Sequence, residues 1–439
     1  MILKVVVSAL CLFFCTVSLV CAESDASEFQ LFPPGKPIET YHIPNTENIV
    51  DAYLIVKSGA YARSEKEGIS HYLEHLVWMN ARDGASIELS SLHGFNAWTS
   101  GEATVYRVSA DSSDIEKLIH SISMVFDTPD TFSDKMLEER QIILREYETR
   151  TASDLLFSTR AKLRNRAFGT KGRGRSVLGT PESILSMLPE EAFAVHQLTH
   201  QPQNAVLIIT GKLDLENLKS LISKYFNLPS TQIKSKQIPR SRFNLTRDIQ
   251  EKEVHKFNSE ILLYLKRINL QTSVSKDLMQ LRLNFLSDIL NSTLDGSLAK
   301  PLRYDAFISS GYTLTLGALE RDEIVVSFSA RPDVGVSLQN LLLAFEQHLK
   351  TLEKTGIPSA TFDRVRTRKL NSISRVFDDW EFALDLIISQ IFNDAPIISP
   401  EKFKKRLSDI TLDELNSLAG LLAGPGLVVG TLVQPISTK

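Results

Sequence analysis

The chain has 439 residues, of which 49 are Lys or Arg and 52 are Asp or Glu, so its formal net charge at pH 7 is -3. A nearly balanced charge gives no general attraction to nucleic acid or to an anionic membrane surface, and we expect neither as a partner. Hydrophobic residues make up 43% of the chain, which is enough to bury sizeable cores, and the length suggests two or three domains.

The first 22 residues have the pattern of a secretory signal peptide. A lysine near the start precedes an apolar run from Val5 to Val20, and the segment ends in Cys21 and Ala22. Small residues favour cleavage after Ala22, which would give a periplasmic or secreted protein with no stable membrane insertion. Two alternatives stay open. The apolar run is nearly long enough to act as an uncleaved anchor, and Cys21 could carry a lipid, although the bulky Val20 disfavours this.

All three cysteines, Cys11, Cys15 and Cys21, fall inside this segment. A chain cleaved after Ala22 would have no cysteine, so disulfide bonds could not contribute to its stability. Any metal site in it would have to be built from His and carboxylate side chains.

Periodic apolar residues predict the elements of the first half in order. Alternation over 40–58 predicts two strands about a turn, and helices are expected over about 69–80 and near 86–92. The period-two pattern over 95–110 predicts one half-buried strand. It could be an edge strand that binds an extended peptide, or an ordinary strand of the core. A single long helix is expected over about 133–169, because no Gly or Pro interrupts it.

The second half resembles the first in its order of elements. A polar, charged stretch over 231–254 has few apolar residues to anchor it, so we expect a linker there. Beyond it, the order of strand, helix, strands, helices and strand recurs weakly, which indicates duplicated αβ units. We therefore expect one domain over 23–230, a linker over 231–254 and a second domain over 255–439.

The segment GISHYLEHLVWMN, residues 68–80, carries His71, Glu74 and His75. Side chains four residues apart on a helix lie one turn above each other, so the two imidazoles can bind one metal ion. Glu74 lies close to the same face and could take a proton from a metal-bound water, as in the H-x-x-E-H motif of inverted zincins. The motif is short enough to arise by chance, so its meaning depends on what accompanies it.

Two further pairs of residues bear on the motif. His196 and His200 are also four apart but have no acid between them, and we interpret them as ordinary residues near a helix end. In the long helix, Glu139 and Glu146 are seven residues apart, which is two turns, so they share one face. By itself such a pair is typical of a solvated helix surface.

These residues resemble the pitrilysin/insulinase family of zinc peptidases, family M16, which includes mitochondrial processing peptidase. The resemblance rests on GISHYLEHL, FNAWTSGEATVY and EERQIILRE, which stand in the family's order and at its approximate distances. It covers nearly the whole chain after the signal segment. It implies an α+β fold of two related αβ domains, each a mainly antiparallel sheet covered by helices, with the zinc motif only in the first.

The resemblance also implies a zinc site and the role of each residue in it. His71, His75 and Glu146 would bind one Zn2+ per chain, and Glu74 would act as the general base. Glu139 would orient a zinc ligand from behind.

Other residues are implied in substrate binding and catalysis. Asn96 and Ala97 match the family's edge strand, where Asn96 would hydrogen-bond the substrate backbone. The second half of these enzymes supplies an Arg and a Tyr, for which this chain offers Arg303 and Tyr312, nine residues apart and wider than the family's usual spacing. Tyr312 would stabilise the oxyanion of the tetrahedral intermediate, or it is an ordinary strand tyrosine.

Together these features predict an exported zinc endopeptidase that acts on peptides or unfolded polypeptide segments. Family enzymes enclose their substrates between two halves of about this size, so we expect a homodimer or a heterodimer with another M16 chain. Two alternatives stay open. A non-catalytic partner subunit is favoured by the irregular spacing of Arg303 and Tyr312, and a metal-buffering periplasmic protein would need neither Glu74 nor the edge strand.

Overall fold

The structure, a computed structural model, describes residues 29–34, 37–62, 66–84, 92–128, 132–228, 243–254, 257–320, 322–375 and 379–436. The signal peptide expected over 1–22, the helix expected near 86–92 except for its last residue, and the first half of the expected linker, 231–242, lie outside these residues. Among the described helices, none combines the length and the apolar character needed to cross a lipid bilayer.

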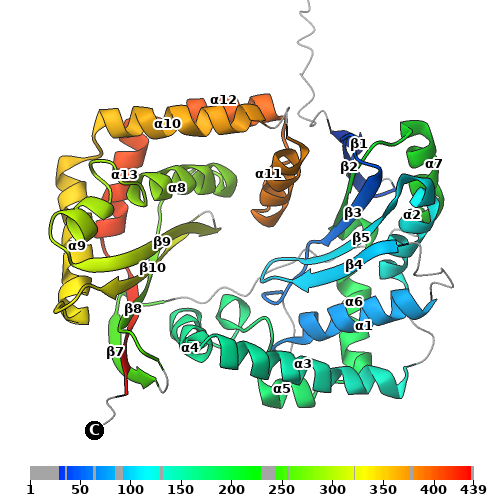
Figure 1. Ribbon diagram of the computed structural model, residues 1–439, viewed down its shortest axis with the longest axis horizontal. Helices are drawn as coiled ribbons and strands as arrows, with labels where there is room; N and C mark the ends of the chain where they lie inside the picture. Colours follow the sequence, from blue (N-terminus) through cyan, green and yellow to red (C-terminus); the bar gives the residue numbers. More distant parts are fainter. Residues whose placement is uncertain are drawn as a thin grey trace, which may run out of the picture.

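The first sheet runs through the middle of the first half (Figure 1). Its strands are β1 (Gln30–Phe32), β2 (Glu39–Ile43), β3 (Ile49–Val56), β4 (Leu92–Thr99), β5 (Thr104–Asp111) and β6 (Ala205–Thr210). Their order is β1-β2-β6-β3-β5-β4, and of these described pairs only β2 and β6 are parallel. Successive side chains of β3 face opposite ways. Leu54 therefore belongs to the main core of this half, and Ile55 to a second cluster on the other face.

Seven helices of the first half are described. They are α1 (Ile69–Gly84), α2 (Ile115–Ser123), α3 (Asp134–Ser153), α4 (Phe157–Phe168), α5 (Pro181–Leu185), α6 (Pro189–Thr199) and α7 (Leu215–Tyr225). Apolar residues of α1, α2, α6 and α7 cover one face of the first sheet and form the main core with it. The core therefore fixes α1, which carries the metal motif, against the sheet.

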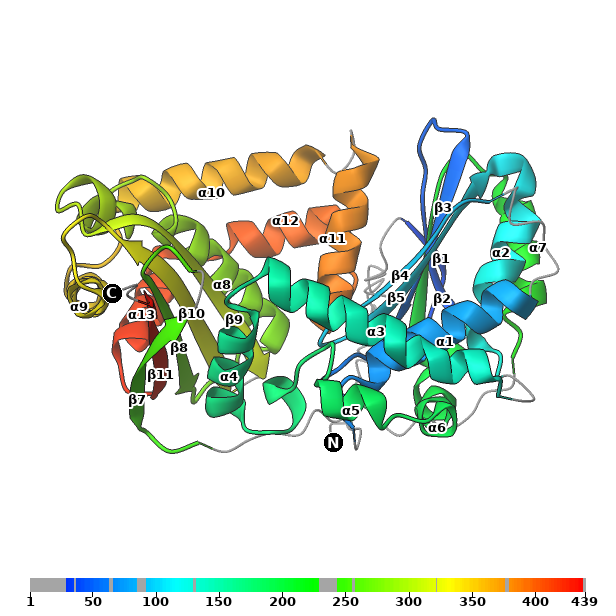
Figure 2. The ribbon, with the colours of Figure 1, turned by 60° about the horizontal axis from the view of Figure 1, so that its bottom comes forward.

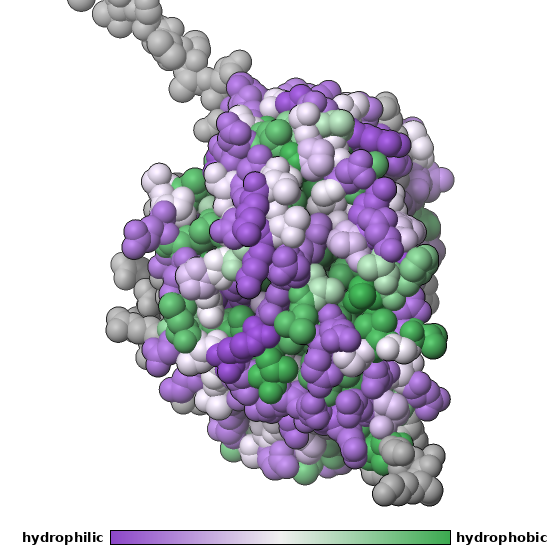
Figure 3. Space-filling model, turned by 90° about the vertical axis from the view of Figure 1, so that its left-hand side faces the viewer, coloured by the Kyte–Doolittle hydropathy of each residue, from purple (hydrophilic) through white to green (hydrophobic). Residues whose placement is uncertain are grey.

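The second half repeats this architecture. Its strands are β7 (Arg247–Val254), β8 (Ile261–Asn269), β9 (Ser309–Glu320), β10 (Glu323–Pro332) and β11 (Leu427–Pro435), in the order β7-β11-β8-β10-β9. Its helices are α8 (Lys276–Leu290), α9 (Leu338–Thr355), α10 (Ser359–Ser374), α11 (Trp380–Phe392), α12 (Pro400–Ser408) and α13 (Leu412–Ala423). Its outward face mixes hydrophilic and hydrophobic residues (Figure 3).

The two sheets share one strand order. When β1 is set aside, each sheet places its first, last, second, fourth and third strands side by side. In each, the first and last strands are parallel and the other neighbouring pairs are antiparallel. This confirms the expected fold of two related αβ domains with mainly antiparallel sheets.

The pattern over 95–110 forms a hairpin, so the expectation of a single strand is wrong. β4 ends at Thr99 and β5 begins at Thr104. The Ser100 hydroxyl accepts hydrogen bonds from the N–H groups of Glu102 and Ala103 at 3.2 and 3.0 Å. These bonds close the turn between β4 and β5.

The core-facing residues are odd-numbered in β4, as at Phe95 and Ala97, and even-numbered in β5, as at Tyr106 and Val108. Trp98 is in step with β5 but is 37% exposed, so the period-two pattern joined residues of opposite faces.

The long helix expected over 133–169 is two helices. α3 ends at Ser153 and α4 begins at Phe157. Between them Asp154 has an extended backbone, and its carboxylate accepts the N–H of Leu156 at 3.1 Å. An Asp side chain bonded to a nearby N–H competes with the helical pattern, so the helix stops without Gly or Pro.

Part of the stretch expected as a linker is a strand. β7, residues 247–254, pairs with β11 at the edge of the second sheet. Its sequence RDIQEKEV is largely polar and each of its side chains is exposed or half-buried, so it has no apolar run for periodicity to detect. The remaining domain limits stay predictions.

Each half covers the sheet of the other half with its fourth helix, α4 or α11 (Figure 2). Leu163 and Phe168 of α4 lie in one apolar cluster with Leu263 of the second sheet. Ile387 of α11 lies in another cluster with Ile55 of the first sheet. The face of each sheet that lies opposite its own main core is therefore buried by a helix from the other half.

Two arginines join α4 to the second sheet. Arg166 donates to the carboxylate of Asp248 at 2.7 Å and to the carbonyl of Gly430 at 2.9 Å. Arg267 of β8, only 2% exposed, donates to the carbonyl of Ala167 at 2.7 Å. Charged hydrogen bonds thus reinforce the apolar contact between the halves.

Candidate metal centre

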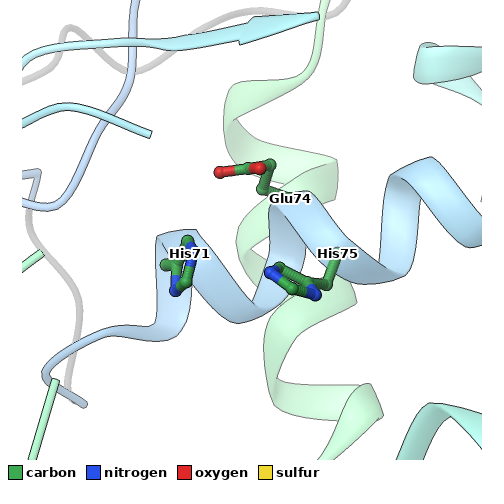
Figure 4. A group of neighbouring side chains, drawn as sticks. All are labelled: His71, Glu74 and His75. Atoms are coloured by element: carbon green, nitrogen blue, oxygen red, sulfur yellow. The ribbon is translucent and has the colours of Figure 1, made fainter. Parts of the chain in front are cut away.

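The motif residues project from the first turns of α1 (Figure 4). Gly68 precedes the helix with a φ of +85°, and a Cβ there would lie 2.8 Å from backbone of another segment, so glycine is required. Ligand atoms of His71, Glu74 and His75 lie within 4.8 Å of one another. The backbone turn at Gly68 and the spacing along α1 together bring the three side chains close to one another.

Helix α3 brings a carboxylate to the two imidazoles. The Tyr72 hydroxyl on α1 donates to the carbonyl of Met136 at 2.6 Å and ties the two helices together. Oε2 of Glu146 lies 3.6 Å from Nε2 of His71 and 3.7 Å from Nε2 of His75. Both imidazoles therefore face the same carboxylate oxygen.

This arrangement fits a tetrahedral zinc site. Zinc binds His nitrogen and carboxylate oxygen at about 2.0–2.2 Å, so two ligand atoms of a tetrahedron are roughly 3.4 Å apart. The separations at Glu146 exceed this value by only a few tenths of an ångström. Burial, with a smaller effect from His75, lowers the pKa of His71 to about 3, so the imidazole is neutral and keeps a lone pair for a metal.

Glu139 lies behind His75. Its Oε2 is 3.0 Å from Nδ1 of His75. A carboxylate at Nδ1 fixes the orientation of the ring and leaves Nε2 for a metal. For His71, by contrast, Nδ1 is buried without a hydrogen-bond partner in the described part of the chain.

Glu74 is buried beside the end of β4. Glu74 is only 6% exposed. Its burial raises the pKa of the carboxyl group to about 7, although hydrogen bonds from Thr99 and the charge of His75 act to lower this pKa. The Thr99 hydroxyl donates to Oε2 of Glu74 at 2.6 Å. A carboxyl group with this pKa can accept and release a proton near neutral pH. Thr99 could not be predicted from the sequence, because no spacing rule connects it to Glu74.

Asn96 and Ala97 lie on β4, which is the edge strand of the first sheet. Asn96 is exposed and Ala97 is half-buried. β4 pairs with β5 on one side, and no described strand pairs with its other side. The two residues are therefore on an edge beside the candidate metal centre, while their role in binding substrate stays a prediction.

The equivalent edge strand of the second half is β9. Its backbone is hydrogen-bonded by one side chain within α8 and by one at the C-terminal end of α8. Gln280 accepts the N–H of Ala318 at 2.7 Å. Asn291 donates to the carbonyl of Leu314 at 2.9 Å and accepts the N–H of Leu314 at 3.2 Å. These amides occupy backbone groups that another strand would need for pairing.

Arg303 and Tyr312 make their contacts within the second half. The Tyr312 hydroxyl donates to the carbonyl of Leu290 at 3.1 Å. The guanidinium of Arg303 lies 5.8 Å from the ring centre of Tyr304. Among the described hydrogen bonds and ion pairs, none joins either residue to the α1 motif, and their part in catalysis stays a prediction.

His196 and His200 use their ring nitrogens within the first core. Nε2 of His196 bonds the carbonyl of Val125 at 2.8 Å, and Nε2 of His200 lies 2.9 Å from the Tyr106 hydroxyl. Burial lowers the pKa of His196 to about 4 and that of His200 well below its ordinary value. The pair near the helix end is thus part of the packing of the fold.

We expect the zinc-free protein to lose stability between pH 7 and pH 5. His196 and His200 stay neutral in the folded chain at pH values where the unfolded chain takes up their protons, below a pKa near 6.5. Each such histidine costs roughly 1.4 kcal/mol of unfolding free energy per pH unit below 6.5. The raised pKa of Glu74 acts oppositely, because its contribution is lost as the pH rises toward 7.

The measurement is therefore a thermal melt of the Glu74→Gln variant, because this substitution removes the opposing carboxyl group. A chelator in the buffer keeps the protein free of zinc. The melting temperature should be lower at pH 5 than at pH 7. An equal or higher value at pH 5 would contradict the prediction that the buried histidines oppose protonation.

Glu139→Gln should weaken zinc binding by about 10- to 100-fold, because a neutral amide supports the His75 ring less well than a carboxylate. Competition with a chromophoric chelator measures the affinity. The matched control is Glu138→Gln, a neighbouring exposed acid on α3, which should bind zinc as the parent protein does. Equal affinities in the two variants would show that Glu139 does not support His75.

A duplicated αβ fold with two imidazoles and a carboxylate grouped beside an edge strand is typical of zinc peptidases built from paired halves. The comparisons with known sequences agree, and the chain belongs to the insulinase family, peptidase family M16. The model described as Insulinase (Peptidase family M16) matches residues 41–181, and the model described as Peptidase M16 inactive domain matches residues 189–369. Since this is a family of zinc proteases, membership supports a peptidase role.

Relatives include zinc proteases and beta subunits of the mitochondrial-processing peptidase. The zinc protease PqqE of Helicobacter pylori is 23% identical over 358 residues, which is 78% of each chain. The beta subunit of the mitochondrial-processing peptidase of Saccharomyces cerevisiae is 26% identical over 219 residues, 48% of this chain and 46% of that subunit. The matches to several such relatives thus span about half of their length.

Solved structures share the fold across nearly the whole chain. The first half of the periplasmic protease PqqL from Escherichia coli has a TM-score of 0.74 and 17% identity, with 93% of this chain and 92% of that chain covered. When the complete PqqL chain is compared, this chain covers 47% of it. PqqL therefore contains about twice the length that this chain matches.

Proposed function

We propose that the protein is an exported zinc-dependent endopeptidase that hydrolyses peptides or unfolded segments of proteins. One observation supports this above the others. Nε2 of His71 and Nε2 of His75 lie 3.6 and 3.7 Å from the same oxygen of Glu146, beside the buried carboxyl group of Glu74.

The imidazoles of His71 and His75 and the carboxylate of Glu146 would hold one zinc ion. A zinc ion there would supply a water molecule acidic enough to lose a proton near neutral pH, and would polarise the scissile carbonyl. Glu74 accepts that proton and passes it to the leaving amine. Glu139 holds the ring of His75 in place.

The substrate would bind as an extended strand along β4. Pairing of this kind recognises main chain more than side chains, so substrates are peptides or segments that can unfold. Asn96 and Ala97 lie on this strand, where Asn96 would hydrogen-bond the substrate backbone. β9 is a poor alternative because Gln280 and Asn291 already bond its backbone.

Export and partnership are further parts of the proposal. Export rests on the signal-like segment over 1–22, and PqqL is a periplasmic protease. A second M16 chain, either another copy or a related protein, would complete the enclosure, since PqqL carries about twice this length in one chain. In such a pair of chains, Arg303 and Tyr312 are the groups that the second half of this chain would contribute to an active site.

A non-catalytic partner subunit is the competing function. Such a subunit has no need for a complete site, whereas this chain retains His71, Glu74, His75 and Glu146 in one group. The complete set favours the peptidase.

The test uses the chain from residue 23 onward and a quenched, unstructured peptide. We expect one zinc per chain, cleavage that stops with a chelator, and recovery when zinc is restored. The monomer and dimer fractions are assayed separately, so that a need for partnership is visible. A protein that binds zinc but cuts no peptide in either fraction would overturn the proposal in favour of a non-catalytic subunit.

A further inference from the structure

We propose that Thr99 is a positioning residue that holds the carboxylate of Glu74 in its working orientation through the hydrogen bond to its hydroxyl. The inference rests on the proposed function, because it concerns the general base of that site. The contact joins Oγ1 of Thr99 to Oε2 of Glu74 at 2.6 Å. Since a carboxylate has two oxygens, the bond at Oε2 leaves Oε1 available to face a water molecule.

The carboxylate needs such a partner. Glu74 is 6% exposed, and a buried charged group without a hydrogen bond is costly. Three rotatable bonds separate its carboxylate from the backbone of α1, so helical geometry alone does not fix where the oxygens point. A donor from another element fixes them.

The donor is itself held firmly. Thr99 is the last residue of β4 and pairs with Thr104 of β5. The turn that follows is closed by the Ser100 hydroxyl and by a hydrogen bond of 2.9 Å from the N–H of Ala60 to the carbonyl of Ser100. Gly59 lies so close to this turn that a Cβ would be 2.5 Å from the Ser100 oxygen. The Thr99 hydroxyl is therefore presented from a closely packed turn.

Thr99 also connects the base with the strand proposed to bind substrate. Asn96 and Thr99 belong to the same strand, and at about 3.3 Å per residue they are roughly 10 Å apart along it. A peptide paired with β4 is thus placed relative to the same element that orients Glu74. Thr99 sets the distance between the scissile bond and the base, without contacting the reacting atoms itself.

The test compares Thr99→Val, which has the same shape without a donor, with Thr99→Ser, which keeps the hydroxyl. The matched control is Thr104→Val, because Thr104 lies directly across the hairpin and its hydroxyl donates to the carbonyl of Ser58 at 2.9 Å, away from Glu74. We expect Thr99→Val to lower kcat about 10-fold with KM and zinc content unchanged. Thr99→Ser should stay within about twofold of the parent, and Thr104→Val should keep its kcat.

A second readout does not depend on activity. Melting temperatures of the zinc-free parent, Thr99→Val, Glu74→Ala and the double variant form a cycle, in which each single change removes one partner of the hydrogen bond. The combined shift should be smaller than the sum of the single shifts if the two side chains interact. Additive shifts, an unchanged kcat in Thr99→Val, or an equal loss in Thr104→Val would overturn the inference. If the parent cuts no peptide, the proposed function fails, whereas the melting cycle still tests the contact.

Discussion

Glu74→Gln should retain one zinc per chain and lose about 10³-fold in kcat for peptide cleavage, within the range that general acid–base catalysis contributes. The amide keeps the size of the side chain and can still accept the Thr99 hydroxyl bond, but it cannot take a proton from water. The proposed ligands His71, His75 and Glu146 are untouched, so metal affinity should be preserved.

Zinc content, melting temperature and peptide affinity of the Glu74→Gln protein separate loss of chemistry from loss of structure. Glu138→Gln, an exposed acid on α3, serves as the charge-matched control. A Glu74→Gln protein with parental turnover would refute the assignment of the base, and one without zinc would mean that Glu74 acts as a ligand.

Glu146→Gln should lose zinc, with an affinity more than about 100-fold lower than that of the parent, above the usual cost of losing a supporting contact. The two imidazoles face one oxygen of Glu146 at 3.6 and 3.7 Å, so the variant removes the single anionic group among the three proposed ligands. A neutral amide binds a divalent cation less well than a carboxylate, and activity should fall with the metal.

Chelator competition and atomic absorption measure this loss. Glu148→Gln, two residues further along α3 and also exposed, is the matched control and should bind zinc normally. Addition of excess zinc should restore part of the activity of Glu146→Gln. Parental affinity in this variant would show that the ion, where it binds, is held by other groups.

The sequence predicted the parts of the site that helical spacing determines. His71 with His75, and Glu139 with Glu146, recur at one and two turns, so each pair was expected on a common face. The structure brings both helices together, and the family comparison confirms the resemblance to M16. Thr99 was missed because its contact with Glu74 depends on the fold of the hairpin, which no local pattern records.

The misses in the fold have similar causes. The hairpin was taken as one strand because Trp98 is in step with the alternation of β5, although the core-facing positions change from odd to even across the turn. β7 was taken as linker because a half-exposed edge strand needs no apolar run. The break at Asp154 depends on one side-chain bond. Periodicity shows that α4 and α11 have apolar faces, but it does not say which sheet each face will cover.

The exchange of α4 and α11 makes the two halves poor candidates for separate expression. A recombinant fragment ending before β7 would leave Ile55 and its neighbours without the helix that shields them, and the complementary fragment would leave Leu263 bare. Each fragment would expose a large hydrophobic surface and would tend to aggregate. Mixing both pieces during refolding supplies the missing cover to each, so they should regain solubility as a nicked, non-covalent whole.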